Sequence, residues 1–140
     1  MKSFMDLTFN YWMSHRPRKC MFSKTAIVVS TAAGSGAKTA VKDITDALFY
    51  WGISCVLSYG ISIQAMNWKG VNDKKIQKIE KDTTKIANKV LKNKRVKVGL
   101  KTKALFMMMR MMQQKGWGSG EAEKEYWEKN GWMGKERPWK

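Results

Sequence analysis

A short loop of small residues is the part of this chain whose composition and spacing could bind a ligand. Residues 32–37 have the sequence Ala-Ala-Gly-Ser-Gly-Ala and follow an apolar run that predicts a strand. In open α/β sheets, small ligands bind beyond the carboxyl ends of the strands, which is where such a loop would lie. The glycines also suit a plain turn between a strand and a helix, and the composition favours neither interpretation over the other.

The segments around this loop predict a strand, a helix and a second strand in succession. Residues 25–31 are continuously apolar and β-branched, which is typical of a parallel strand covered by helices on both faces. The helix is predicted to extend to Trp51, and Gly52 follows where a left-handed cap costs glycine least. Residues 53–59 form the second predicted strand, so the unit is a right-handed βαβ crossover. The apolar face of the helix comprises Ala37, Ala40, Val41, Ile44, Ala47, Leu48 and Trp51.

The remainder of the chain predicts mainly helices. We expect a helix over residues 1–13, a basic loop over 14–20, a connector over 60–70, and further helices over 71–91, 96–114 and 121–129. The tail, residues 131–140, is aromatic and irregular. The long helix over 71–91 carries its lysines on the solvent face, and its predicted buried stripe comprises Ile76, Ile79, Thr83, Ile86, Ala87, Val90 and Leu91.

The composition corresponds to one domain at most and argues against several classes of protein. With 140 residues, of which 44% are hydrophobic, the chain can form a modest core. Cys20 and Cys55 lack CxxC spacing, which argues against a disulfide framework or an iron–sulfur site. No run approaches the roughly 20 apolar residues of a spanning helix, and the first residues are unlike a signal peptide. We therefore expect a cytoplasmic protein without a transmembrane segment.

Catalytic side chains of the usual kinds cannot be assembled from this sequence. Its eleven acids are scattered without a paired-carboxylate, metal-ligand or Ser/His/Asp arrangement, so we predict no catalytic residue and no metal site. His15 lies beside Arg16 and could contact an anionic cofactor or exchange protons, although a solvent-facing histidine is the favoured interpretation. Lys38 and Thr39 end a segment similar to a phosphate loop. Ala37 occupies the position of the required second glycine, which argues against a nucleoside triphosphatase.

Two further features suggest interaction surfaces. The formal net charge is +16, and residues 69–110 contain 14 Lys/Arg against three acids, a field that favours anionic partners or solubility. A lysine-covered helix with an intact apolar stripe and no interleaved aromatic residues is more typical of a solvated face. Nucleic-acid binding is therefore the less favoured interpretation. The Met-rich run 107–112 and nearby Trp117 predict core packing or a dimer contact in preference to a membrane-interface helix.

In their order and spacing, several short motifs resemble the carboxyl-terminal half of the flavodoxin-like NAD(P)H-dependent FMN reductases and quinone reductases. The nearest likeness is to a clostridial-type branch of flavodoxin family oxidoreductases, and it covers nearly the whole chain. The motifs are residues 1–6, His15-Arg-Pro17, Ser30-Thr-Ala-Ala-Gly-Ser-Gly36, Phe49-Tyr-Trp-Gly52, Tyr59-Gly60, Gly116-Trp-Gly-Ser119, Glu125-Tyr-Trp127 and Arg137-Pro-Trp139.

The resemblance implies an α/β fold with a flavodoxin-like parallel sheet, of which this chain supplies the last two strands with their flanking helices. Residues 1–92 would form the carboxyl-terminal half of that domain, and residues 93–140 a basic, Met/Trp-rich helical extension. The implied function is that of a flavoprotein, an FMN-dependent NAD(P)H oxidoreductase of the flavin or quinone reductase type, and family members commonly pair into homo-oligomers.

The resemblance also assigns cofactor contacts. In the family, the loop after the fourth strand lies along the isoalloxazine ring of FMN, and its backbone amides contact the polar edge of the ring. Hydride passes from the nicotinamide to flavin N5, and the protein only positions the rings. Carried over to this sequence, the cofactor-binding residues are Thr31, Ala32, Ala33, Gly34, Ser35 and Gly36.

The sequence departs from the family at its start. A flavodoxin fold begins with a strand and a Ser/Thr/Gly-rich loop that wraps the FMN phosphate at a helix N-terminus, and the first three strands have no counterpart here. Because a two-stranded sheet is marginal by itself, we expect a truncated chain that binds FMN poorly or not at all on its own. The alternative function is a non-catalytic basic interaction protein that binds nucleic acid or an anionic membrane surface.

Overall fold

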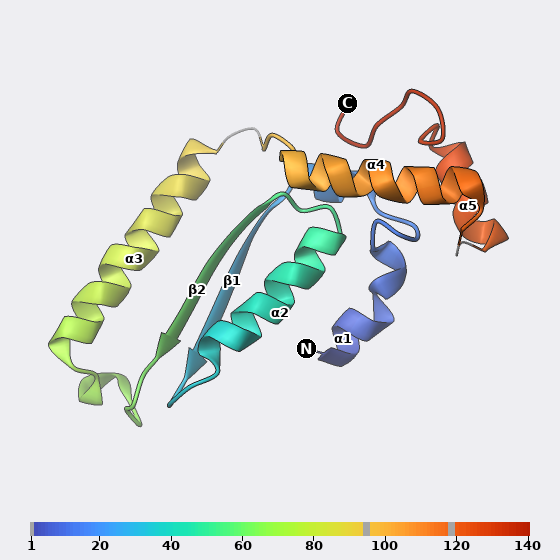
Figure 1. Ribbon diagram of the computed structural model, residues 1–140. Coiled ribbons are helices and arrows are strands. Elements are labelled where there is room, and N and C mark those ends of the chain that lie inside the picture. Colours follow the sequence, from blue (N-terminus) through green and yellow to red (C-terminus); the bar gives the residue numbers. More distant parts are fainter. Residues whose placement is uncertain (1, 94–95, 118–119) are drawn as a thin grey trace.

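Two parallel strands joined by a helix form the centre of the molecule. The computed structural model describes residues 2–93, 96–117 and 120–140. Strand β1 (Thr25–Ala32) pairs in parallel with β2 (Cys55–Ser62), from Thr25 opposite Cys55 to Ala32 opposite Ser62, and α2 (Ala37–Tyr50) connects the strands (Figure 1). The structure is therefore α/β, and the predicted βαβ unit is confirmed.

Helix α2 packs on the sheet through the face that its apolar periodicity predicts. Ala37, Val41 and Ala47 are buried, as is Trp51 directly after the helix. Gly52 has a φ of +97° and donates its backbone N–H to the Phe49 carbonyl at 2.9 Å. It is therefore the predicted left-handed cap.

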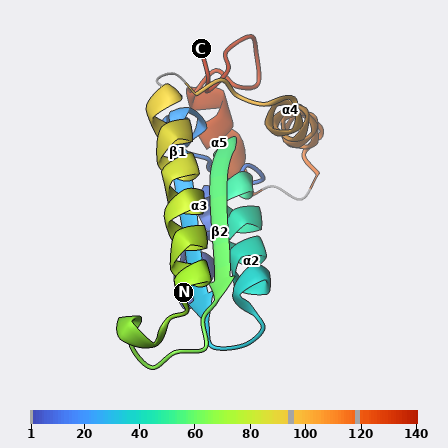
Figure 2. The same ribbon diagram turned by 90° about the vertical axis from the view of Figure 1, so that its left-hand side faces the viewer.

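The sheet has one helical layer on each face. Helix α3 (Asp73–Lys92) lies on the opposite side of the strands from α2 (Figure 2), and α1 (Lys2–Leu7) lies beside α2 (Figure 1). The Asn72 side chain accepts a hydrogen bond from the Lys74 N–H at 2.9 Å and caps α3, which explains why this helix begins two residues later than predicted. None of the helices in the described parts of the chain combines the length and the apolarity that crossing a bilayer requires.

The burial predicted for β1 and for α3 is wrong. Ile27 and Val29 are 50% and 62% exposed, and Val28 alone is buried in β1. No residue of α3 is fully buried, although its apolar side is turned to the sheet. Ile79 and Ile86 of this helix line a hollow of about 400 Å³ together with side chains from both strands. The cause is that α3 stands off from the strands and leaves apolar surface on both sides incompletely covered.

Four predicted boundaries are also wrong. One is the start of the helix predicted over residues 96–114, which begins at Leu100 in the structure. The first helix ends at Leu7 rather than at residue 13, because the Thr8 hydroxyl bonds the Phe4 carbonyl at 2.7 Å and the chain tightens into a 3₁₀ turn, Phe9–Tyr11. Strand β2 begins two residues late, since the Ile53 N–H bonds the Leu48 carbonyl of the preceding helix at 3.1 Å. The same strand continues to Ser62 through residues predicted as connector.

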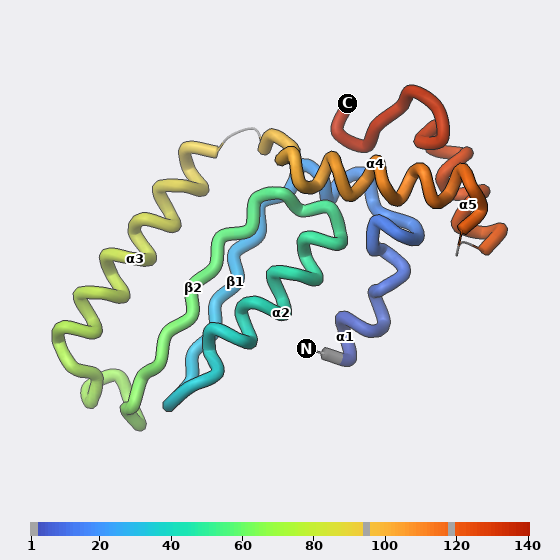
Figure 3. The backbone as a smooth tube through the Cα atoms, in the orientation of Figure 1, coloured from blue at the N-terminus to red at the C-terminus, as the bar shows by residue number. Residues whose placement is uncertain are grey.

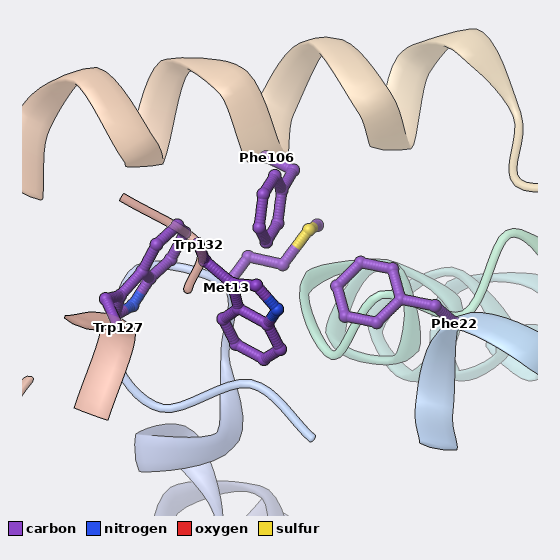
Figure 4. Close-up of a cluster of buried hydrophobic side chains, with 5 residues drawn as sticks. All are labelled: Met13, Phe22, Phe106, Trp127 and Trp132. Carbon is purple, nitrogen blue, oxygen red and sulfur yellow. The ribbon is translucent and has the colours of Figure 1, made fainter. Parts of the chain in front are cut away.

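The carboxyl-terminal segment builds the main core together with the residues before β1. Helix α4 (Leu100–Lys115) and helix α5 (Glu121–Lys129) lie near the start of β1, as does the end of the chain (Figure 3). Short 3₁₀ helices, Lys19–Ser23 and Trp68–Gly70, complete the elements. We define the aromatic cluster as the five side chains in Figure 4, which are Met13, Phe22, Phe106, Trp127 and Trp132, each at most 2% exposed.

Hydrogen bonds fasten α4 and α5 to the loop that follows α1. Gln113 Nε2 donates to the Ser14 carbonyl at 2.9 Å, and the Tyr126 hydroxyl donates to the Pro17 carbonyl at 2.8 Å. Burial raises the pKa of Tyr126, which keeps this hydroxyl a donor at neutral pH. Residues before and after position 93 thus share one core, and the proposed division at that position stays a prediction.

Candidate functional site

The loop predicted to contact a cofactor lies at the carboxyl edge of the strands. It leaves β1 at Ala32 and enters α2 at Gly36, whose φ of +102° is a left-handed conformation that favours glycine (Figure 1). Gly36 provides no side-chain cap, so the first turn of α2 presents its backbone amides beside the loop. The loop and this first turn thus expose backbone amides where the sequence predicts a cofactor contact, and the contact itself stays a prediction.

Gly60 brings the second strand close to this loop. It lies opposite Ser30 in the sheet, and a Cβ atom at Gly60 would stand 3.1 Å from the Ala37 carbonyl oxygen. Glycine at this position therefore lets the first turn of α2 approach the strand. Two separate motifs of the sequence, residues 30–36 and Tyr59-Gly60, thus become neighbours in space.

The loop borders a small hollow that the connector after β2 completes. This hollow has a volume of about 360 Å³, and its lining residues are Thr31, Ala32, Ala33, Ile63, Ala65, Asn67, Trp68 and Val71. Asn67 Oδ1 accepts a hydrogen bond from the Gly70 N–H at 3.0 Å, which holds the short helix that carries Trp68. Trp68 is 59% exposed, and its side chain is the aromatic one that lines this hollow with the loop.

Trp68 and the Asn67 turn are the part of this site that sequence analysis missed. The sequence predicts only a connector over residues 60–70, because a lone tryptophan between two predicted elements gives no periodic signal. The available signal was local: Asn67 followed at the third position by Gly70 is typical of a turn stabilised by an Asn side chain.

Tyr59 lines the apolar hollow beneath α3, where it lies with Thr31 and Trp68. Its hydroxyl is buried and has no hydrogen-bond partner among the residues that the structure describes. Burial raises the pKa of Tyr59, and the negative charge of Asp82 adds to the shift. The hydroxyl therefore stays protonated at neutral pH and is available to donate a hydrogen bond.

The loop is open to solvent where a planar ligand would lie. Thr31 and Ala33 to Gly36 are exposed, and a Cβ atom added at Gly34 would meet nothing within 4 Å. Gly34 is therefore not required for packing in this chain. Backbone amides and an exposed tryptophan can hold a flat, partly apolar ring, but they supply neither an acid nor a base.

His15 and Arg16 lie away from this loop, among residues of the carboxyl-terminal segment. The His15 carbonyl accepts a hydrogen bond from Trp127 Nε1 at 2.6 Å, and His15 Nδ1 stands 3.9 Å from a Glu123 carboxylate oxygen. Arg16 Nε lies at the same distance from Glu123. These contacts fasten the loop before β1 to α5 at the opposite end of the strands. The structure thus brings neither residue to the candidate site.

The two edges of the sheet differ in chemistry. A groove of about 620 Å³ beyond β1 is lined mostly by apolar side chains of β1, α2 and the first 12 residues, including Met5, Trp12 and Ile44. A groove of about 630 Å³ at β2 carries charged side chains of the flanking helices, which are Lys38, Lys42 and Asp46 of α2 and Lys78 and Asp82 of α3. Charged groups beside an edge disfavour further strand pairing, and they are more numerous here than at the β1 groove, where Asp43 and Asp46 are the charged lining residues.

Comparisons with known proteins add no assignment. No protein-family model matches the chain, and neither the curated proteins nor the solved structures give a significant match. Across the described ranges, no group of three or more His, Cys, Asp or Glu side chains is arranged to hold a metal ion.

Proposed function

We propose that this chain forms the carboxyl-terminal half of an FMN-dependent NAD(P)H oxidoreductase of the flavin or quinone reductase type. The observation that carries the proposal is the mostly apolar groove along β1, which α1 and α2 border. Within the described residues, the sheet holds two strands only, which is marginal for an independent sheet. A parallel sheet with helices on both faces gains stability when further strands extend it.

The arrangement of helices supports extension at β1 rather than at β2. The ring of Phe4 in α1 lies 6.0 Å from that of Trp51, which follows α2, and Met5 of α1 lines the groove along β1. Helix α1 therefore lies beside α2 at the β1 side of the sheet (Figure 1). Because α1 borders the apolar groove, an added strand next to β1 would lie beneath a helix already in place. At the opposite edge, charged side chains of α2 and α3 flank β2. The asymmetry fits a sheet whose outermost strand is β2 and whose interior strand is β1.

In this proposal, residues 31–36 border the flavin ring and Trp68 flanks it. FMN would supply the redox chemistry by accepting hydride from the nicotinamide. The chain's own part is to place backbone amides along the polar edge of the ring and to exclude water beside it. The described residues offer no second Ser/Thr/Gly-rich loop for the FMN phosphate. They therefore fit the ring of the cofactor and leave its phosphate to be held elsewhere.

Gly34 provides the sharpest test of where the ring lies. We expect millimolar FMN to shift the amide resonances of residues 31–36 and of Tyr59 and Gly60, with weak affinity. The Gly34→Val substitution should abolish these shifts, because its side chain would project into the space that the ring needs, while the fold has room for it. The measurement is a ¹⁵N–¹H correlation titration of both proteins.

Gly99→Val is the matched control, since Gly99 also has open space around an added Cβ and an ordinary φ of −68°. This variant should retain the FMN response of the parent. Shifts confined to other parts of the chain, or none at millimolar FMN, would remove the loop from the site. Tight, stoichiometric binding by the chain alone would contradict the half-domain proposal instead.

A further inference from the structure

Six lysines form a straight stripe along the outer side of α3. They are spaced by four, three, four, four and three residues, so that all fall within an arc of about 80° of the helix and extend over about 27 Å of its length. Each of the six is exposed. We define the lysine stripe as Lys74, Lys78, Lys81, Lys85, Lys89 and Lys92.

The stripe points away from the protein. The isoleucines of α3 occupy the opposite side of the helix, where Ile79 and Ile86 line the hollow against the strands. Helix α3 is also the outermost element on its side of the sheet, as both views show (Figures 1 and 2). Lys78 differs from the other five lysines because it also lines the groove at β2. The other five lysines of the stripe are accessible to a large, rod-shaped partner.

Little negative charge within α3 offsets the stripe. Lys78 pairs with Asp82 at 2.8 Å, which leaves five lysines of the stripe without an ion pair among the described residues. The other acids of the helix, Asp73 and Glu80, lie on flanks of the helix away from the arc of the stripe. A row of single-sign charge this long attracts polyanions in preference to small anions.

We propose that the lysine stripe binds the phosphate backbone of double-stranded nucleic acid. A duplex carries about one negative charge per 1.7 Å and stays straight over the length of α3, so it offers a complementary line of charge. The inference is independent of the flavin proposal, because the stripe uses no residue of the loop. The sequence alone favours an ordinary solvated face for this helix. The angular alignment of the lysines is the observation that favours duplex binding over that interpretation.

The same helix is poorly suited to the other polyanions. An amphipathic helix binds a membrane surface by inserting its apolar face, and that face of α3 is turned to the strands. Single-stranded nucleic acid is held largely by stacking on aromatic rings, and α3 contains no aromatic residue. Contacts through lysine alone carry no base readout, so binding should be independent of sequence.

The test is a salt titration of binding to a mixed-sequence DNA duplex of about 24 base pairs, long enough to exceed the stripe at 3.4 Å per pair. Five phosphate contacts predict a slope of log K against log salt of about −4.5. Replacing Lys81, Lys85 and Lys89 by glutamine should reduce the steepness by about 2.7 and weaken binding about tenfold or more at 100 mM salt. Glutamine has nearly the helix propensity of lysine, so the helix persists.

A second triple variant, Lys124→Gln, Lys135→Gln and Lys140→Gln, removes the same charge from exposed positions outside α3. It should retain the slope and most of the affinity of the parent. If both variants lose the same affinity, the duplex is attracted by the overall charge of the protein, and the proposal that the lysine stripe binds it is wrong. The proposal also fails if the chain prefers the single strand of the same length, or if it binds phosphatidylserine vesicles through the stripe but not the duplex.

Discussion

Trp127→Ala is expected to lower the free energy of unfolding by about 3–5 kcal/mol, a large part of the total for a domain of this size. Trp127 is fully buried in the aromatic cluster, where its ring stacks on Phe106 at 4.8 Å between centroids and meets Trp132 edge-on at 5.6 Å. Alanine would leave a cavity that surrounding rings cannot fill. It would also remove the donor to the His15 carbonyl. Urea unfolding followed by circular dichroism measures the loss.

Two companion variants separate the causes. Trp117→Ala removes the same side chain from a site that is 57% exposed, where the Lys115 ammonium lies 4.5 Å from the centre of its ring, and should cost less than about 1 kcal/mol. Trp127→Phe keeps much of the ring volume but leaves the His15 carbonyl without its donor, and should fall between the two. If Trp127→Ala unfolds no more easily than Trp117→Ala, the aromatic cluster is not the core of the protein.

The central βαβ unit was predictable because every local signal agreed. A β-branched apolar run, two glycines, an amphipathic helix and a capping glycine each indicate the same crossover, and the structure has it with the expected parallel pairing. The errors occur where local signals compete. Gly60 interrupts the apolar pattern of β2 and marks a close approach to α2, yet by sequence it suggests the end of the strand.

The main core could not be located from the sequence. Met13, Phe22 and Phe106 come from three separate segments, and the two tryptophans come from a short helix and from a tail without regular structure. Neither helical nor strand periodicity links such residues, because their contacts join positions about a hundred residues apart. The groove along β1 could not be predicted for the same reason, because it depends on where α1 lies relative to β1.

For the candidate site, sequence reasoning located the loop and the structure supplied its surroundings. The loop follows from the order of strand and helix, which local patterns predict well. The hollow beside it depends on how the connector after β2 folds back, and Trp68 reaches it only because a three-residue 3₁₀ helix places it there. The alignment of the lysine stripe, in contrast, is already present in the sequence as a period of 3.6 residues. It indicates a binding surface only once the structure shows that the opposite side of α3 faces the strands.

Gly52→Ala is expected to destabilise the protein by about 2–5 kcal/mol, through two additive causes. A left-handed φ of +97° costs a non-glycine residue about 1–2 kcal/mol, and a Cβ atom here would lie 2.8 Å from Phe22 ring carbons, an overpacking worth about 1–3 kcal/mol. Phe22 cannot yield easily, because it is 1% exposed within the aromatic cluster. Thermal and urea unfolding of the variant measure the loss.

Gly116→Ala isolates the first of these causes. Gly116 ends α4 with a φ of +69°, but an added Cβ there would meet nothing within 4 Å, so only the backbone strain applies. Its cost should therefore be about 1–2 kcal/mol, clearly below that of Gly52→Ala. In the Phe22→Leu background, the excess cost of Gly52→Ala should shrink, since a smaller side chain leaves room for the methyl group. Equal costs at the two glycines, unchanged by Phe22→Leu, would mean that the turn after α2 does not press against the aromatic cluster, and the link between the βαβ unit and that core would have to lie elsewhere.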